Sequence, residues 1–219
     1  MKKSPPARKD QSQTEFIRSS AKSTELIEAR HRKIIEGACE LFFKKGYHRT
    51  TIREIAVASG MSMGQLYHYI SSKDDVLFLI YKHMQAIWFE HLRESGVEEI
   101  DDPLQRLTKA LEQTLVFMIE NKDLLLFIYT ETKYLDRKRL HAVLEMDDTS
   151  VVSFWRRLLR EAGGEAVIEG DLNFYANLIS YLMVFLVLRG WNIKDKPLRE
   201  HGETLINFIL KGMGITHKS

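Results

Sequence analysis

The fold is decided by one stretch, Thr50-Thr51-Ile52-Arg53-Glu54-Ile55-Ala56-Val57-Ala58-Ser59-Gly60-Met61-Ser62-Met63-Gly64-Gln65-Leu66-Tyr67-His68-Tyr69. Ile52, Ile55 and Ala56 have the i, i+3, i+4 spacing of one helix face. Gly60 follows four residues later and can take the left-handed conformation that ends a helix. These features predict a short helix that ends in a turn at Gly60.

A second short helix follows the turn. Ser62 is a natural N-cap for it, because a serine hydroxyl can accept a hydrogen bond from a free backbone N–H. Leu66 and Tyr69 pack the helix, and its other side has few apolar residues. Residues 51–70 therefore predict a helix-turn-helix whose second helix enters the DNA major groove.

Three runs carry a family resemblance: Thr51-Ile-Arg-Glu-Ile-Ala56, Ser59-Gly-Met-Ser-Met-Gly-Gln-Leu-Tyr-His-Tyr-Ile70 and Ser72-Lys-Asp-Asp-Val76. Together they resemble the signature of the TetR/AcrR family of bacterial repressors. Ser59, Met61 and Ile70 replace the usual alanine, valine and phenylalanine but keep roughly the size or polarity needed. The motif covers about residues 27–90. The rest resembles the family only in length and helical character.

Composition describes an ordinary soluble protein. The 219 residues are 44% hydrophobic and 28% charged, and the four prolines and twelve glycines leave room for helices throughout. The single cysteine, Cys39, excludes an internal disulfide and a multi-cysteine metal site. We expect no cofactor and no metal. The polar N-terminus and the short apolar run at 182–188 predict a cytoplasmic protein without a membrane partner.

Charge is unevenly distributed along the chain. Residues 1–75 contain 14 Lys and Arg against 9 Asp and Glu, although the whole chain has a net charge of only +2. A basic N-terminal third suits a polyanion-binding domain. Residues 1–23 are predicted to form a basic, flexible leader. The alternative is an arm that contacts DNA phosphates or the minor groove.

The helical pattern predicts an all-α protein of about nine helices. A three-helix DNA-binding domain (24–72) is followed by a connecting helix (73–95) and a C-terminal domain (96–219). Ser72 is expected to cap the connecting helix, with Asp75 as its reciprocal partner. A long helix at 138–161 is expected to end at Gly163-Gly164. The most apolar helix, 172–191, is predicted to be buried on all sides.

A homodimer is expected for two reasons. The last two helices, 168–191 and 197–213, have more apolar surface than a small bundle covers, and the resemblance implies that they pair with their two-fold copies. A helix-turn-helix reader also needs two recognition helices, about 34 Å apart, to read a palindrome. The alternative is a monomer with the apolar helix at its own centre.

DNA contacts are predicted mainly on the second helix. Gln65 carries an amide that can pair with adenine, and Tyr67 and His68 can reach the sugar-phosphate chain or base edges. The resemblance implies that Lys73 binds a phosphate. The full predicted set is Thr50, Thr51, Arg53, Ser62, Met63, Gly64, Gln65, Tyr67, His68 and Lys73.

The resemblance also implies an effector cavity in the C-terminal domain. Its candidate lining is Leu111, Thr114, Leu115, Met118, Phe127, Glu131, Tyr134, Trp155, Asn177 and Tyr181. Such a cavity would suit a hydrophobic effector, such as a fatty acyl thioester or an aromatic compound, although the same side chains could equally form plain core. Effector binding is expected to shift the protein towards a state that releases its operator.

Two other functions compete with a ligand-responsive repressor. An enzyme is disfavoured because the chain lacks a His-Glu-x-x-His, a Gly-x-Ser-x-Gly and a phosphate-loop motif. A DNA-binding regulator or architectural factor that answers to a protein partner would have the same N-terminal domain. The operator sequence, the effector, the regulated genes and the sign of regulation are not encoded in these patterns.

Overall fold

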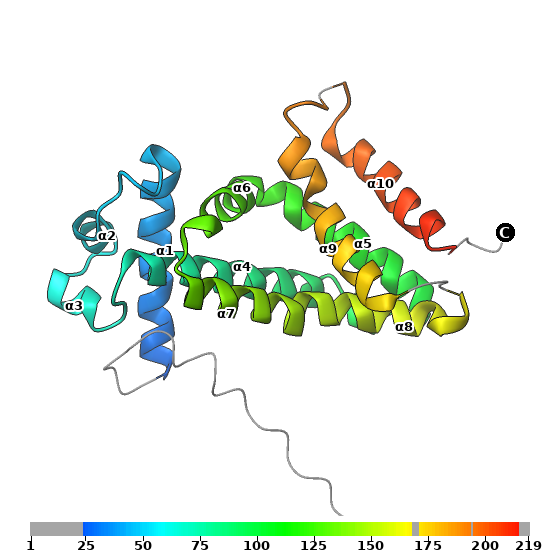
Figure 1. Ribbon diagram of the computed structural model, residues 1–219, viewed down its shortest axis with the longest axis horizontal. Coiled ribbons are helices and arrows are strands. Elements are labelled where there is room, and N and C mark those ends of the chain that lie inside the picture. The colour runs from blue at the N-terminus through cyan, green and yellow to red at the C-terminus, as the bar shows by residue number, and fades with distance from the viewer. Residues whose placement is uncertain (1–23, 168–170, 194, 215–219) are drawn as a thin grey trace, which may run out of the picture. The chain divides into compact units, whose positions relative to one another are not determined.

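The computed structural model describes residues 24–167, 171–193 and 195–214, and these contain helices and no strand, which confirms the all-α fold (Figure 1). The predicted leader, 1–23, lies outside the described residues. The α-helices are α1 Thr24–Lys45, α2 Ile52–Ala58, α3 Met63–Tyr67, α4 Lys73–Glu94, α5 Pro103–Glu120, α6 Lys122–Glu131, α7 Arg137–Asp147, α8 Ser153–Val167, α9 Leu172–Arg189 and α10 Leu198–Gly212.

The chain forms two compact units. Among the described residues, the first contains 24–79 together with Tyr134–Ala142, and the second contains Ile80–Lys133 together with the described residues from Val143 onward. α4 and α7 therefore each pass from one unit into the other. The boundaries predicted at 72/73 and 95/96 remain predictions.

The first unit is built on the apolar face of α1. Ile34 and Ala38 are fully buried, as are Ile55 of α2 and Leu66 of α3. α1 and α2 approach so closely that a Cβ atom on Gly37 would lie 2.8 Å from the backbone carbon of Ala58. The three helices thus form one small core whose spacing is set by a glycine.

The second unit packs α5, α8, α9 and α10 around fully buried Leu107, Leu111, Trp155 and Leu158. α7 and α8 are joined by a π-helical segment, Asp148–Val152, so the single helix expected at 138–161 is a composite of three segments. Counting that composite as one helix gives the predicted total of nine for the described residues. The expected end at Gly163-Gly164 is wrong, because α8 continues to Val167. Glycine inside a helix costs only about 1 kcal/mol, which packing can offset.

The prediction that the most apolar helix is buried on all sides is also wrong. α9 buries six residues, but Phe174 and Tyr181 are about 60% exposed and Leu178 and Phe185 are 38% exposed. These four residues recur at i, i+4, i+7 and i+11 and share one face. By length and composition α9 could cross a membrane, but a core helix of a soluble protein passes the same test.

We predict that Gly37→Ala destabilises the first unit by about 1–3 kcal/mol, the usual range for overpacking. The added methyl group would meet the backbone of Ala58 and Ser59 below 3.0 Å, so α1 and α2 must separate. Urea unfolding followed by circular dichroism measures the loss. Gly64→Ala is the control, because its Cβ would meet nothing nearer than 4.0 Å. Equal stability of the two variants would contradict this account of the α1–α2 contact.

Candidate nucleic-acid interface and ligand cavity

Reciprocal side-chain caps fix both helices of the helix-turn-helix. Oγ1 of Thr51 accepts a hydrogen bond from the Glu54 backbone N–H (3.3 Å), and Oε2 of Glu54 accepts from the Thr51 N–H (2.9 Å). A bond from Lys45, followed by those from Thr51, lowers the pKa of Glu54 to about 2. Gly60 has a φ of +66° and makes the predicted turn. The motif is therefore held by local bonds as well as by its core.

The side chains of α3 divide as the sequence predicts. Leu66 is fully buried, whereas Gln65, Tyr67 and His68 are exposed, and Tyr67 is 51% exposed. Ser62 and Gly64 are also exposed, and Met63 is half-buried. The exposed residues form the polar face that the sequence assigns to base and phosphate contacts.

Gln65 has a structural bond that the sequence analysis did not include. Its Oε1 accepts a hydrogen bond from the Ser62 backbone N–H (2.9 Å), and Oγ of Ser62 accepts from the Gln65 N–H (3.2 Å). A bidentate pair with adenine needs both the oxygen and the nitrogen of the amide. In this conformation the oxygen already accepts one bond, so a pair with adenine would have to share that oxygen with the cap or replace the cap.

Two of the predicted DNA contacts, Thr50 and Lys73, have other bonds in the structure. Thr50 is only 1% exposed, and its hydroxyl donates to the carbonyl oxygen of Gly46 (2.9 Å), so its predicted role at the surface is corrected to an internal one. Nζ of Lys73 donates to the carbonyl oxygens of Tyr47 (2.8 Å) and Thr50 (3.2 Å), and lies over the Tyr47 ring. Lys73 therefore ties α4 to the α1–α2 connection.

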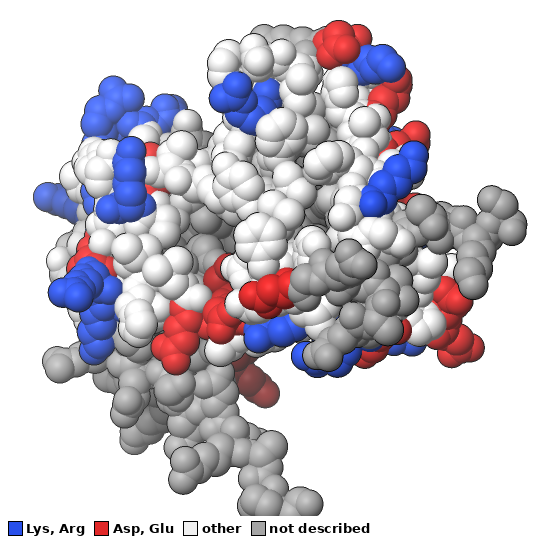
Figure 2. Space-filling model, turned by 45° about the vertical axis from the view of Figure 1, so that its right-hand side comes forward, with Lys and Arg blue, Asp and Glu red and all other residues white. Residues whose placement is uncertain are grey.

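Thr51 and Arg53, the other two predicted contacts in this region, are exposed. Lys and Arg side chains recur over the surface of the first unit, at the left of Figure 2. Exposed cations near a polar helix face suit the sequence-independent part of DNA binding.

The start of α4 contains a buried ion pair that sequence reasoning missed. Asp75 is 1% exposed, and its Oδ2 accepts hydrogen bonds from the backbone N–H groups of Ser71 (2.6 Å) and Ser72 (3.0 Å), which confirms the predicted cap. Its Oδ1 accepts from Nε of Arg139 at 2.8 Å. The Tyr134 ring stacks on Tyr47, so the segment Tyr134–Ala142 is held to the first unit by a charge and a ring.

A cavity of about 360 Å³ lies within the second unit. Its volume is in the range of small-molecule sites. α4, α5, α6, α7, α8 and α9 all contribute to the wall, which is largely apolar: Met84, Trp88, Met118, Leu125, Ile128, Val143, Leu144, Val151, Trp155, Met183 and Val184. The remaining wall is polar: Tyr81, Gln85, Thr114, Tyr129, Thr132, Asp147, Asn177, Ser180 and Tyr181.

The polar groups of the cavity are only partly bonded to one another. The Tyr81 hydroxyl donates to Oδ1 of Asp147 (2.9 Å), and the Trp88 indole N–H donates to the Thr114 hydroxyl (3.1 Å). Nε2 of Gln85 and Oγ of Ser180 are buried without a hydrogen-bond partner. Buried polar groups without a partner in the protein are characteristic of a cavity that receives a ligand or water.

Residues 34–80 match the family model described as bacterial regulatory proteins, tetR family. Residues 34–80 therefore form a domain of the TetR family. The matched segment covers most of the first unit, and includes α2, α3 and the start of α4.

Curated relatives of the chain are named as transcriptional regulators. The HTH-type transcriptional regulator HbdR of Aromatoleum sp. (strain CIB) is 32% identical over 130 residues, which are 59% of this chain and 56% of HbdR. The chain spans about half or less of the length of HbdR and of two further curated relatives that it matches.

Solved structures cover more of the chain. A bacterial regulatory protein in the tetR family from Rhodococcus RHA1 has a TM-score of 0.69 and 19% identity over 85% of this chain and 98% of its own. AibR, solved with isovaleryl coenzyme A and operator DNA, has a TM-score of 0.62 and 22% identity over 85% of this chain and 98% of its own. At these identities the likeness shows the shared fold.

The cavity contains half of the predicted effector contacts. Thr114, Met118, Trp155, Asn177 and Tyr181 line it. Leu111 and Leu115 instead belong to the core of the second unit, Phe127 is buried, and neither Phe127 nor Glu131 lines the cavity. Tyr134 is corrected, because it stacks on Tyr47 in the first unit. The missed residues Tyr81 and Gln85 face inward from α4, and their i, i+4 spacing was the available signal.

We predict that Gln65→Glu weakens operator binding at least tenfold while leaving the melting temperature nearly unchanged. Glutamate keeps the oxygen that accepts from Ser62 but replaces the amide donor with a negative charge facing DNA. Fluorescence anisotropy with a selected operator measures affinity. Gln65→Ala removes the cap and should lose about 0.5–1 kcal/mol of stability. Unchanged operator affinity in Gln65→Glu would show that Gln65 acts only as a cap.

We predict that Arg139→Met lowers the free energy of unfolding by about 3 kcal/mol, because it leaves the buried Asp75 carboxylate without its cation. Chemical denaturation measures this loss. Arg137→Met, at an exposed position two residues away, is the matched control and should change little. Identical denaturation midpoints for both variants would exclude a stabilising role for the ion pair.

Proposed function

We propose that the protein is a cytoplasmic transcriptional repressor that binds a palindromic operator as a homodimer and is released by a small hydrophobic effector. The observation that carries the proposal is the exposed polar face of α3, presented by a chain that also contains an apolar cavity. A helix-turn-helix supplies sequence reading, and a cavity supplies a means of control. The TetR-family domain and relatives named as transcriptional regulators support this function over catalysis.

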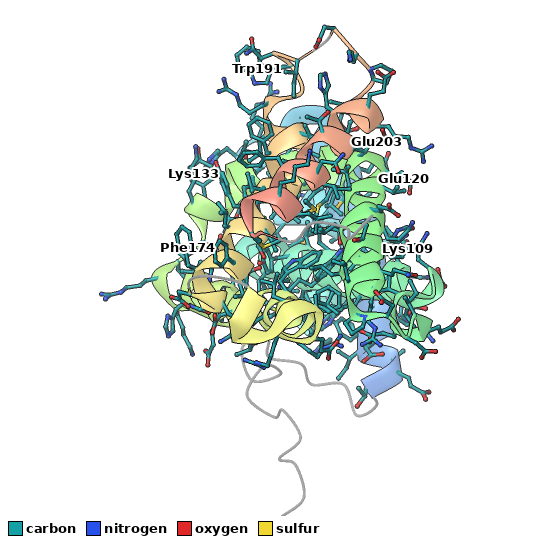
Figure 3. The ribbon with its side chains drawn as sticks, turned by 90° about the vertical axis from the view of Figure 1, so that its right-hand side faces the viewer. Lys109, Glu120, Lys133, Phe174, Trp191 and Glu203 are labelled. Atoms are coloured by element: carbon teal, nitrogen blue, oxygen red, sulfur yellow. The ribbon has the colours of Figure 1, made fainter. Side chains whose placement is uncertain are left out.

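The apolar face of α9 supports the homodimer. Phe174, Leu178, Tyr181 and Phe185 share that face, and Phe208 of α10 is 65% exposed. Figure 2 shows a broad surface without charged side chains over this part of the second unit. Phe174 and Trp191 lie on one side of the unit together with Lys133, whereas Lys109, Glu120 and Glu203 lie on the other (Figure 3). Apolar surface gathered on one side favours association through it.

Two segments that pass from the cavity wall into the first unit support a route by which an effector could release the operator. Thr132 and Val143 line the cavity, and the segment between them, Tyr134–Ala142, packs in the first unit with the helix-turn-helix. α4 likewise contributes Asp75 to the first unit and Tyr81 to the cavity. An effector that favours one arrangement of the cavity wall would shift both segments, and thereby the population of operator-binding protein.

A regulator controlled by a protein partner is the alternative. It would use the same helix-turn-helix, and its cavity would be filled only by solvent. The largely apolar wall of a cavity of about 360 Å³ favours a small molecule, because such a wall gains more from an apolar ligand than from solvent.

We predict that Phe174→Asp combined with Phe208→Asp shifts the protein from dimer to monomer, raising the dimer dissociation constant at least a hundredfold. Both side chains are at least 60% exposed in the single chain, so the substitutions should leave the fold intact. Light scattering during size-exclusion chromatography measures the mass. Leu26→Asp, on an exposed apolar residue of α1, is the control. A variant that remains dimeric would place the interface elsewhere.

The function is tested by selecting DNA from a random pool with the purified protein. We expect an enriched sequence with two-fold symmetry, and binding that weakens steeply with salt. A library of hydrophobic metabolites is then screened for release of that DNA. Failure to enrich any sequence would refute operator binding. Enrichment without release by any compound would favour the alternative.

A further inference from the structure

The cavity wall contains an acidic side chain and no basic one among the described residues. Of the twenty described residues that line it, Asp147 is the only Asp or Glu, and none is Lys, Arg or His. A carboxylate or phosphate group of a ligand is normally held by Arg or Lys. The described wall therefore offers an anionic ligand no counter-charge and one repulsive group.

Asp147 has unused hydrogen-bonding capacity. One of its oxygens accepts from the Tyr81 hydroxyl, and no basic side chain in the described part of the chain forms an ion pair with it. Burial raises its pKa, the Tyr81 bond opposes that rise, and the neighbouring charge of Asp148 adds to it. A carboxylate in this position gains from a cation or a strong hydrogen-bond donor.

The pKa values of two tyrosines in the wall reflect burial and the negative charge of Asp147. Burial and then the charge of Asp147 raise the pKa of Tyr129 to about 12, and the same two causes raise the pKa of Tyr81 well above its usual range. Burial penalises a ligand charge of either sign, whereas the negative charge of Asp147 opposes an anion and favours a cation. A ligand carboxylate is therefore disfavoured by both causes, and a ligand ammonium group is favoured by the second.

Two further polar atoms of the wall have no hydrogen-bond partner. Nε2 of Gln85, on a side chain only 8% exposed, is a donor and would bond an acceptor of the ligand, whereas Oγ of Ser180 can accept from an ammonium group. Oε1 of Gln85 accepts from Ser150 at 3.3 Å. Asp147, with the Tyr81 hydroxyl on one of its oxygens, is therefore the charged acceptor in an otherwise largely apolar wall.

We propose that the effector is a compact amphipathic amine whose apolar body fills the cavity and whose ammonium group donates to Asp147. This inference rests on the proposed function, because it specifies the class of molecule that the cavity takes. The apolar wall contributes affinity through burial, and Asp147 sets the preference for a cation over an anion. A carboxylic acid, or a thioester carrying phosphates, is a poor fit to this wall.

The test uses a matched series with one apolar body and three head groups: 4-phenylbutylamine, 4-phenylbutanol and 4-phenylbutanoate. Dissociation constants for the full-length protein are measured by isothermal titration calorimetry, with isovaleryl coenzyme A as a further anionic probe. We expect the amine to bind at least tenfold more tightly than the alcohol, and the alcohol more tightly than the carboxylate. Tighter binding of either anion than of the amine, or no measurable binding of the series at millimolar concentration, would overturn the inference.

Variants identify the group responsible. Asp147→Asn should remove the preference for the amine over the alcohol, a loss of at least tenfold, and should improve binding of the carboxylate. Tyr81→Phe removes the hydroxyl that donates to Asp147 and should strengthen amine binding. Asp148→Asn is the control: its side chain is 62% exposed and does not line the cavity, so the order should persist. Circular dichroism verifies each fold, and a preference for the amine that persists in Asp147→Asn would refute the role of Asp147.

Operator release separates this inference from the proposed function. The selected operator is titrated with protein in the presence of each compound. Release by the amine supports both. Amine binding without release supports the ligand class and refutes its role as effector. Release by isovaleryl coenzyme A, with no binding of the amine, keeps the proposed function and refutes the ligand class.

Discussion

The carboxylate of Asp75 is the constraint on which the arrangement of the first unit depends. It is almost completely buried, and a buried charge is tolerated only when it is fully bonded. One oxygen caps α4 through two backbone N–H groups, and the other holds Arg139 of α7. The residue thus fixes where α4 begins and binds a segment 64 residues away in the sequence.

A second polar link of the same kind joins the same two helices within the second unit. Tyr81 of α4 donates to Asp147 of α7, and both line the cavity. α4 therefore begins at the Asp75 cap in the first unit, and its continuation in the second unit lines the cavity. In our proposal, binding at Asp147 and operator release are therefore coupled through helices that belong to both units, without a separate relay.

A single chain buries the core of the second unit but leaves one apolar face of α9 exposed. The core of the second unit is closed around Trp155 and Leu158, yet α9 keeps Phe174 and Tyr181 in solvent. A helix that packs inside a bundle on one side and exposes aromatic rings on the other fits an interface with a second copy, which supports the homodimer that we propose.

Sequence alone determined the elements that depend on neighbours in the chain. Gly60, Ser62, Asp75 and the apolar spacing of α1–α3 act over a few residues, so the helix-turn-helix and its caps could be predicted. Only the tertiary structure decided which distant side chains meet. Arg139 pairs with Asp75, Thr50 turns inward, Tyr134 leaves the predicted cavity, and Tyr81 joins Asp147 there. Those outcomes depend on how helices pack, which a helix's periodicity does not specify, because one apolar face can meet several partners.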